Sequence, residues 1–543
     1  MKKFDTNFSK PSPQQLNSLL KYYQAGRYID VEKLSISITQ EFPEHPFAWK
    51  VLAVVLNQNG KLRESLVASQ KSVQLEPQDN AAHNNLGNTL QELGRLNEAE
   101  VSYREAITLK PDYAEAYSNL GNILKELGRL EESEASYRKA ITLKPDFADA
   151  YLNLCELLEN SNKLAETLLV IKIAKVKVVG KEADFLFYEA LILFREENYE
   201  IAERLIKRIN KDEIQEKRKT NFLKLKANIY YYRKDYKLAF ETFNDMNESV
   251  KDSHEYKKQE PEMYFNQQKK SIFQIEQLQR KSSYKIETQA TWLQPTFLIG
   301  FPRSGTTLLD TILSSHSKIN VAGEKQMLQK MESELGHFPK ISMIEEIDNE
   351  LAETLSGLYF KELKKHCSLE ENNVAIDKLP LNILKVPLIN KIFPKAKFIL
   401  ALRHPFDCVM SCWMQNFKMN APMANMVDLD RVVDFYCTAM KILNLCEKRY
   451  VLNIHRVRYE DLVLNFEGEV SNILQFLNLK WEEKLRNYQA TALEKGIIDT
   501  PSYSQVVKPI YKTSSYRWKN YEKYLEPYKV QLAPWLQEYG YLN

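Results

Sequence analysis

The sequence predicts two kinds of domain in one chain: an all-α helical-repeat solenoid followed by an α/β domain built on a parallel sheet. A repeat with a 34-residue period fills part of the first half, and short apolar runs alternate with longer helical stretches in the second half. At 543 residues, the chain is also long enough for several separately packed units. We therefore expect a repeat array at 1–250, a linker or connecting helix at 251–291 and an α/β domain at 292–543.

The repeat is clearest at 80–147, where AAHNNLGNTLQELGRLNEAEVSYREAITLKPDY is followed by AEAYSNLGNILKELGRLEESEASYRKAITLKPDF. Small residues at Gly87 and Ala106, an aromatic residue at Tyr103 and proline after the second helix make each copy resemble the tetratricopeptide repeat, a helix-turn-helix unit. The flanking copies are degenerate. Because one helical pair cannot bury its own apolar face, neighbouring pairs stack and leave a groove for a partner. An array that only scaffolds or dimerises the protein is the alternative.

Composition narrows the class of protein. Lysine plus arginine (75) nearly balances aspartate plus glutamate (72), which argues against a nucleic-acid binder with a broad basic surface. The six cysteines lack CxxC pairing, so we expect reduced thiols without a chemical role. The chain has no apolar run near 18 residues and no signal-like N-terminal segment, so we expect a cytoplasmic protein without membrane insertion.

An anion-binding loop is predicted in PTFLIGFPRSGTTLLDTILSSH. An apolar strand ends at Gly300, a tight loop runs to Gly305, and a helix begins at Thr306. Backbone N–H groups of such a loop converge on a phosphate, and the positive end of the helix dipole adds to the attraction. A nucleotide triphosphatase would carry lysine after the second glycine, but Thr306 follows Gly305 and the positive charge lies inside the loop at Arg303. The site therefore suits group transfer without a metal ion.

The PRSGTT segment resembles the 5′-phosphosulfate loop of sulfotransferases that use 3′-phosphoadenosine 5′-phosphosulfate (PAPS) as sulfuryl donor. FILALRHPFDCVMS resembles the 3′-phosphate segment of the same family, and TPSYSQVVKPIYKTSSYRW resembles the C-terminal segment that closes over the nucleotide. The resemblance implies a P-loop-type, sulfotransferase-like fold. The nucleotide-binding residues that it implies are Pro302, Arg303, Ser304, Gly305, Thr306, Thr307, Arg403, Ser411, Ser502 and Lys508.

Two further segments, AGEKQML and AIDKLPLN, resemble the protein-tyrosine sulfotransferase branch. The resemblance implies Glu324 as the base for the acceptor hydroxyl, with Arg303 and Lys378 stabilising charge. The alternatives are a surface glutamate at a helix start for Glu324 and a structural ion pair with Asp377 or another neighbour for Lys378. Thr306 and Thr307 can also cap the helix.

Residues of the C-terminal segment and two histidines also have a purely structural alternative. Arg517 and Trp518 either touch the nucleotide or form a core arginine beside a buried tryptophan. His316 and His404 attract notice because cytosolic small-molecule sulfotransferases use a histidine base. Structural use of both histidines is favoured.

The expected function is metal-free, in-line transfer of a sulfuryl group from PAPS to an acceptor hydroxyl, with a protein tyrosine as one acceptor and a glycan as another. The repeat array would bind the acceptor or a partner. One alternative is a small-molecule kinase with the same loop architecture, which the missing lysine opposes. The other is a repeat-based binding module that carries an inactive transferase domain.

Overall fold

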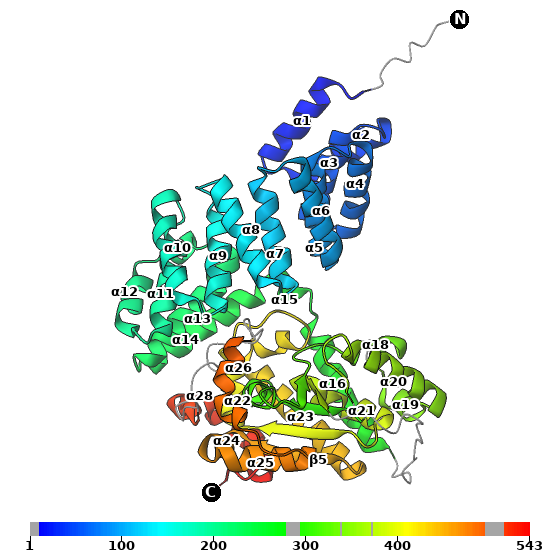
Figure 1. The fold of residues 1–543 in the computed structure, drawn as a ribbon, viewed down its shortest axis with the longest axis vertical. Helices are drawn as coiled ribbons and strands as arrows, with labels where there is room; N and C mark the ends of the chain where they lie inside the picture. The colour runs from blue at the N-terminus through cyan, green and yellow to red at the C-terminus, as the bar shows by residue number, and fades with distance from the viewer. Residues whose placement is uncertain (1–9, 279–293, 337–338, 371–372, 495–514, 543) are drawn as a thin grey trace, which may run out of the picture. The chain divides into compact units, whose positions relative to one another are not determined.

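The computed structural model describes residues 10–278, 294–336, 339–370, 373–494 and 515–542 (Figure 1). The chain divides into two compact units, 1–192 and 193–543. This division lies well before the expected end of the repeat array at residue 250. The domain limits derived from the sequence stay a prediction.

The first unit is built from consecutive helices, and helices α7, α8 and α9 run side by side in Figure 1. They are α1 Pro13–Gln24, α2 Tyr28–Glu41, α3 Pro46–Gln58, α4 Leu62–Leu75, α5 Asn80–Glu92, α6 Leu96–Leu109, α7 Ala114–Glu126, α8 Leu130–Leu143, α9 Ala148–Asn160 and α10 Leu164–Lys177, with most of α11 Glu182–Arg195. This succession of short, mutually packed helices confirms the predicted helical solenoid.

A glycine–tyrosine contact holds each clear repeat together. A Cβ atom at Gly87 would lie 2.6 Å from the ring of Tyr103, so only glycine leaves room for this fully buried side chain. The Tyr103 hydroxyl donates a hydrogen bond of 2.8 Å to Asn88 Oδ1. One period later, Gly121 and Tyr137 repeat the contact at the same 2.6 Å. The spacing of glycine and tyrosine in the sequence is therefore a packing requirement.

The second unit starts with helices that the sequence assigned to the repeats and the linker. They are α12 Tyr199–Lys207, α13 Glu216–Tyr232, α14 Tyr236–Lys251, α15 His254–Lys257 and α16 Pro261–Gln277. Helix α16 lies within the range 251–291 that the sequence assigned to a linker or connecting helix. However, Phe243 and Met246 of α14 and Phe265 of α16 are buried in one hydrophobic core with strand residues such as Phe297. The hairpin α13–α14 and α16 are therefore integral to the α/β unit.

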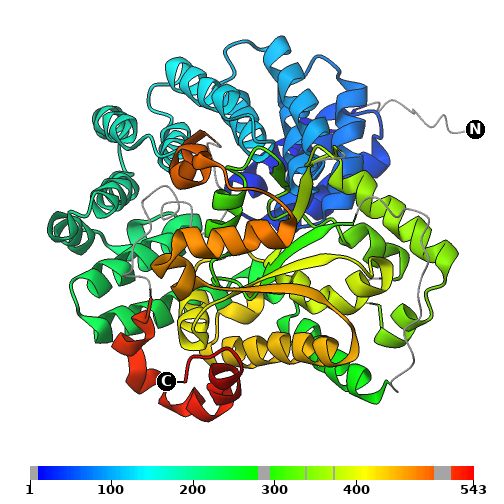
Figure 2. The same cartoon turned by 60° about the horizontal axis from the view of Figure 1, so that its bottom comes forward.

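Five parallel strands form the sheet in the described part of the chain, in the order β2-β3-β1-β4-β5. They are β1 Thr296–Gly300, β2 Ile319–Val321, β3 Val374–Lys378, β4 Lys397–Leu402 and β5 Asn453–Arg458. Phe297 and Ile299 point into one core and Leu298 into a second, so both faces are covered. Figure 2 shows helices on both sides of the strands. The predicted parallel α/β domain is confirmed.

The helices that follow β1 cover the two faces of the sheet. They are α17 Thr306–Leu313, α18 Gln329–Glu334, α19 Ile341–Glu345, α20 Asn349–Leu363, α21 Val386–Ile392, α22 Pro405–Trp413, α23 Leu429–Arg449, α24 Tyr459–Leu464, α25 Phe466–Leu477, α26 Tyr488–Glu494, α28 Glu522–Leu525 and α29 Lys529–Glu538. Among the residues that the structure describes, no helix is long and apolar enough to cross a membrane.

Candidate functional site

The predicted loop lies between the carboxyl end of β1 and the first turn of α17. Gly305 has φ of 103°, a conformation that favours glycine, and Arg303 adopts φ of 70°, which is uncommon for a residue with a side chain. A Cβ atom at Gly300 would lie 2.6 Å from the carbonyl oxygen of Ala401 and 2.7 Å from Ser304 Oγ. The buried Ser304 Oγ has no hydrogen-bond partner among the described residues. A compact loop with an unused hydroxyl fits an anionic ligand.

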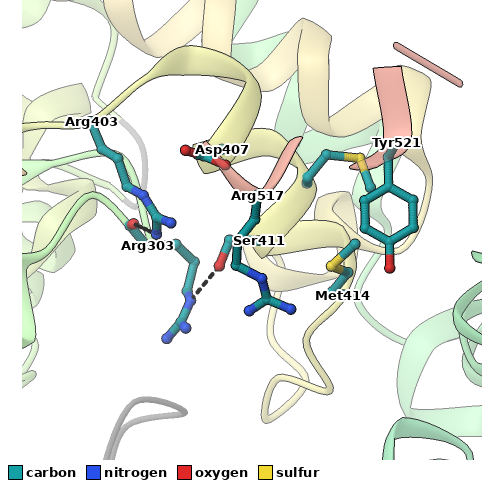
Figure 3. Close-up of a pocket in the computed structure, with 8 residues that line it drawn as sticks. Arg303, Arg403, Asp407, Ser411, Met414, Arg517 and Tyr521 are labelled. Carbon is teal, nitrogen blue, oxygen red and sulfur yellow. Dashed lines mark hydrogen bonds between the residues drawn. The ribbon is translucent and has the colours of Figure 1, made fainter. Parts of the chain in front are cut away.

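Arg403 and Ser411 join this loop from the neighbouring strand β4 and helix α22. Arg303 Nε donates a hydrogen bond of 3.0 Å to Ser411 Oγ, and Arg403 Nη1 donates one of 3.2 Å to the carbonyl oxygen of Arg303. The dashed lines in Figure 3 mark these two bonds. They link residues about 100 positions apart in the sequence. The structure thus brings together both ends of the predicted nucleotide site.

A pocket opens at this junction (Figure 3). It is lined by Arg303, Arg403, Asp407, Met410, Ser411, Met414, Arg517 and Tyr521. The lining carries three guanidinium groups, the hydroxyls of Ser411 and Tyr521, and one carboxylate, that of Asp407. This composition suits a ligand with more than one negative charge.

Glu324 and Lys378 meet at the carboxyl ends of β2 and β3. Lys378 Nζ lies 2.6 Å from Glu324 Oε1 and 3.7 Å from Asp310 Oδ2 in α17. The Lys378 side chain is 1% exposed and that of Glu324 is 36% exposed. Lys378 therefore forms its ion pairs with the candidate base Glu324 and with Asp310, and not with Asp377.

Asp377 is instead completely buried beside Tyr359 and Asn382. The Tyr359 hydroxyl donates to Asp377 Oδ2 at 3.3 Å, and Asn382 Nδ2 donates to Oδ1 at 3.2 Å. Burial raises the pKa of Asp377 to about 7, although both hydrogen bonds favour the charged form. This carboxyl group is linked to the stability of the sheet rather than to the loop.

Both histidines are buried and held by structural contacts. His316 Nε2 donates to the carbonyl oxygen of Lys480 at 2.9 Å, and His316 Nδ1 accepts from the backbone of Lys318 at 3.0 Å. His404 stacks on Trp518, and burial together with Arg403 lowers the pKa of His404 to about 4. These contacts match the structural use that the sequence favoured.

Other predicted residues have simpler positions. Thr306 and Thr307 are buried in the first turn of α17, and the carbonyl oxygen of Pro302 accepts a hydrogen bond from Cys412 Sγ at 3.2 Å. Burial raises the pKa of the Cys412 thiol to about 12, so this cysteine packs the loop as a neutral group. Ser502 and Lys508 lie outside the described residues.

Sequence reasoning missed Asp407 and Tyr521, which also line the pocket. The Asp407 carboxylate accepts hydrogen bonds from the backbone N–H groups of Tyr516, at 2.6 Å, and Trp518, at 2.9 Å. An acidic residue in the first turn of the helix after Arg403 was the available signal for Asp407. Nothing local in the sequence marked Tyr521.

Residues 295–483 match a family described as "Sulfotransferase family", and residues 87–128 and 121–161 match one described as "TPR repeat". An uncharacterized protein of Aquifex aeolicus is 32% identical over 305 residues, which cover 54% of this chain and 39% of that protein. Protein-tyrosine sulfotransferase 1 of Danio rerio is 25% identical over 270 residues, 45% of this chain and 71% of that protein. A solved tetratricopeptide repeat protein from Parabacteroides merdae is 15% identical, with a TM-score of 0.37, over 44% of this chain and 92% of that one. The chain therefore carries tetratricopeptide repeats and, at residues 295–483, a domain of the sulfotransferase family.

Proposed function

We propose that the chain transfers a sulfuryl group from PAPS to the hydroxyl of a tyrosine in a protein acceptor. The observation that carries this proposal is that the loop, the Arg403–Ser411 segment and the Glu324–Lys378 pair all lie at the carboxyl edge of one parallel sheet. Ligands of open α/β sheets bind at this edge, where the strand order reverses around β1. One end of the assembly would take the 5′-phosphosulfate and the other the 3′-phosphate.

The reaction requires a base and fixed positive charge. Glu324 would accept the proton of the acceptor hydroxyl as the acceptor oxygen forms its bond to sulfur and the bond from sulfur to the phosphate oxygen breaks. Adenosine 3′,5′-bisphosphate is the leaving group. Arg303 would bind the sulfonate oxygens. Once Glu324 has taken the proton and become neutral, the Lys378 ammonium group would stabilise the negative charge on the leaving phosphate oxygen.

The remaining predicted residues would bind the donor. The backbone N–H groups of Arg303, Ser304 and Gly305 would donate hydrogen bonds to the 5′-phosphosulfate. Pro302 shapes the loop but has no backbone N–H to donate. The hydroxyls of Ser304, Thr306 and Thr307 would supplement them at the 5′ end, and Arg403 and Ser411 would bind the 3′-phosphate. Ser502 and Lys508 are proposed to close over the nucleotide on the sequence resemblance alone.

A protein acceptor is favoured over a glycan by two comparisons. The Danio rerio relative is named for protein tyrosine, and tetratricopeptide arrays form extended surfaces that bind other chains. The repeats of the first unit would bind the acceptor protein.

Calorimetric titration of the full chain with adenosine 3′,5′-bisphosphate, and separately with ATP plus Mg²⁺, tests the donor. We expect tight, metal-independent binding of the bisphosphate and much weaker binding of ATP. Tight binding of ATP with Mg²⁺ and none of the bisphosphate would contradict the proposal and favour a kinase.

A further inference from the structure

Arg517 comes from the C-terminal segment and lines the pocket together with the loop residue Arg303. Its two chain neighbours, Tyr516 and Trp518, donate backbone hydrogen bonds to the two oxygens of the buried Asp407 carboxylate. This clamp fixes the backbone on both sides of Arg517. Figure 3 shows the Arg517 side chain next to Ser411 and Arg303.

The charge at this position has no compensation in the described structure. Arg517 has no ion pair with a described residue, and its buried Nε has no hydrogen-bond partner there. Asp407, the acidic residue that lines the pocket, uses both oxygens on the backbone of Tyr516 and Trp518. A guanidinium N–H that is sheltered from water and lacks an acceptor is suited to an anionic ligand.

A tyrosine of the helical hairpin α13–α14 supports the same side chain. The Arg517 guanidinium carbon lies 4.1 Å from the centroid of the Tyr231 ring. The Tyr231 hydroxyl accepts a hydrogen bond of 3.2 Å from Asn520 Nδ2, and its ring stacks near Tyr521 with centroids 6.2 Å apart. The ring is thus held on two sides, and a cation over its face loses rotational freedom.

We propose that Arg517 is a third cation for the 3′-phosphate of the nucleotide, and that Tyr231 is a positioning residue that holds Arg517 in the pocket. The ligand is a ribose phosphomonoester, whose two negative charges Arg403, Arg517 and the Ser411 hydroxyl share. This inference rests on the proposed function. It makes the hairpin α13–α14, which has the pattern of a degenerate repeat, part of the nucleotide site of the transferase.

Nucleotide pairs that differ by one phosphate test the role of Arg517. We expect Arg517→Gln to weaken adenosine 3′,5′-bisphosphate binding at least about tenfold while the Kd for 5′-AMP, which lacks the 3′-phosphate, stays within about twofold. Lys519→Gln, which removes an exposed positive charge two residues away, is the matched control and should change neither Kd. Equal weakening of both nucleotides by Arg517→Gln, or no weakening of either, would overturn the role.

A double-mutant cycle tests the role of Tyr231. We expect Tyr231→Leu to weaken bisphosphate binding about three- to fivefold and Tyr231→Phe, which keeps the ring, to restore it. In an Arg517→Gln background, Tyr231→Leu should cause no further loss. An additive loss in that background, or an equal loss of 5′-AMP binding, would show a merely structural tyrosine and overturn the positioning role. If the wild-type chain does not bind the bisphosphate, the proposed function fails as well. If the wild type binds it and only the variants behave differently from expectation, the roles of Arg517 and Tyr231 fail alone.

Discussion

The Glu324–Lys378 pair places a partly exposed carboxylate against a buried ammonium group. In the proposed reaction, the exposed side of Glu324 is where an acceptor hydroxyl would reach the carboxylate. The buried side keeps the positive charge away from water, where its field acts more strongly on neighbouring oxygens. Asp310, 3.7 Å away, gives Lys378 a second acidic neighbour.

Glu324→Gln tests the assignment of the base. The amide keeps the size of the side chain but cannot take a proton, so we expect sulfuryl transfer to fall at least about 100-fold with the Kd for adenosine 3′,5′-bisphosphate changed less than about twofold. Steady-state assays and calorimetry measure the two quantities. Glu332, which pairs with Lys385 at 2.7 Å, supplies the matched control, since Glu332→Gln also breaks a glutamate–lysine pair. Full activity in Glu324→Gln would remove this residue from the mechanism.

The raised pKa of the buried Asp377 carboxyl group should make the stability of the chain depend on pH. Its pKa is about 7 in the folded chain against an ordinary 3.8, so between these values the folded state holds a proton that the unfolded state has lost. The free energy of unfolding therefore falls as pH rises through this window, by at most about 1.4 kcal/mol per pH unit from this group. Above the folded pKa this decline ends.

Urea unfolding between about pH 5 and 7.5, followed by tryptophan fluorescence, measures the decline. We expect a smaller decline in Asp377→Asn than in the wild type, because the amide has no proton to lose. Asp434→Asn, a change at a half-exposed aspartate, should leave the wild-type profile intact. The same profile in Asp377→Asn and the wild type would refute the buried, protonated carboxyl group.

At the scale of elements, each clear repeat depends on a tyrosine ring packed directly on the backbone of the preceding helix. A Cβ atom at Gly121 would lie 2.6 Å from the ring of Tyr137, and this ring is fully buried. The hairpin α7–α8 cannot accept even one methyl group there without moving the ring.

Gly121→Ala should therefore destabilise α7–α8 by about 1–3 kcal/mol, the usual cost of overpacking a core. Hydrogen exchange followed by mass spectrometry on the full chain should show faster exchange of amides in these two helices. Gly357→Ala is the control, because that helical position is exposed with open space around it and should gain up to about 1 kcal/mol. Unchanged protection of α7–α8 in Gly121→Ala would contradict the packing argument.

For the whole molecule, the sequence predicts what depends on local pattern. Periodicity predicted the repeats, alternating apolar runs predicted the parallel sheet, and glycine spacing predicted the loop from Gly300 to Gly305. The resemblance assigned distant residues such as Arg303 and Arg403 to one site, but it did not predict which side chains contact each other. Lys378 meets Glu324 across 54 positions and Asp407 meets Tyr516 across 109, and no local pattern encodes such distances.

The hairpin α13–α14 shows the same limit at a larger scale. Its tyrosine and alanine pattern defines an apolar helix face but does not say which partner covers that face. The sequence grouped the hairpin with the repeats, whereas Phe243 and Met246 lie in the core of the α/β unit. Helical pattern therefore predicts an element, and tertiary packing decides the unit to which the element belongs.

The central claim, sulfuryl transfer from PAPS, is tested most directly by incubating the full chain with sulfur-labelled PAPS and a cell lysate, then separating labelled proteins, glycans and small molecules. We expect label on tyrosine residues of protein, and none above background with Glu324→Gln or Arg303→Ala. Label on glycan alone would show that the acceptor is a glycan, while sulfuryl transfer from PAPS would still stand. No labelled product from the wild-type chain, or the same labelling by the wild type and both variants, would contradict sulfuryl transfer by this site. The alternative of a repeat-based binding module with an inactive transferase domain would then be favoured.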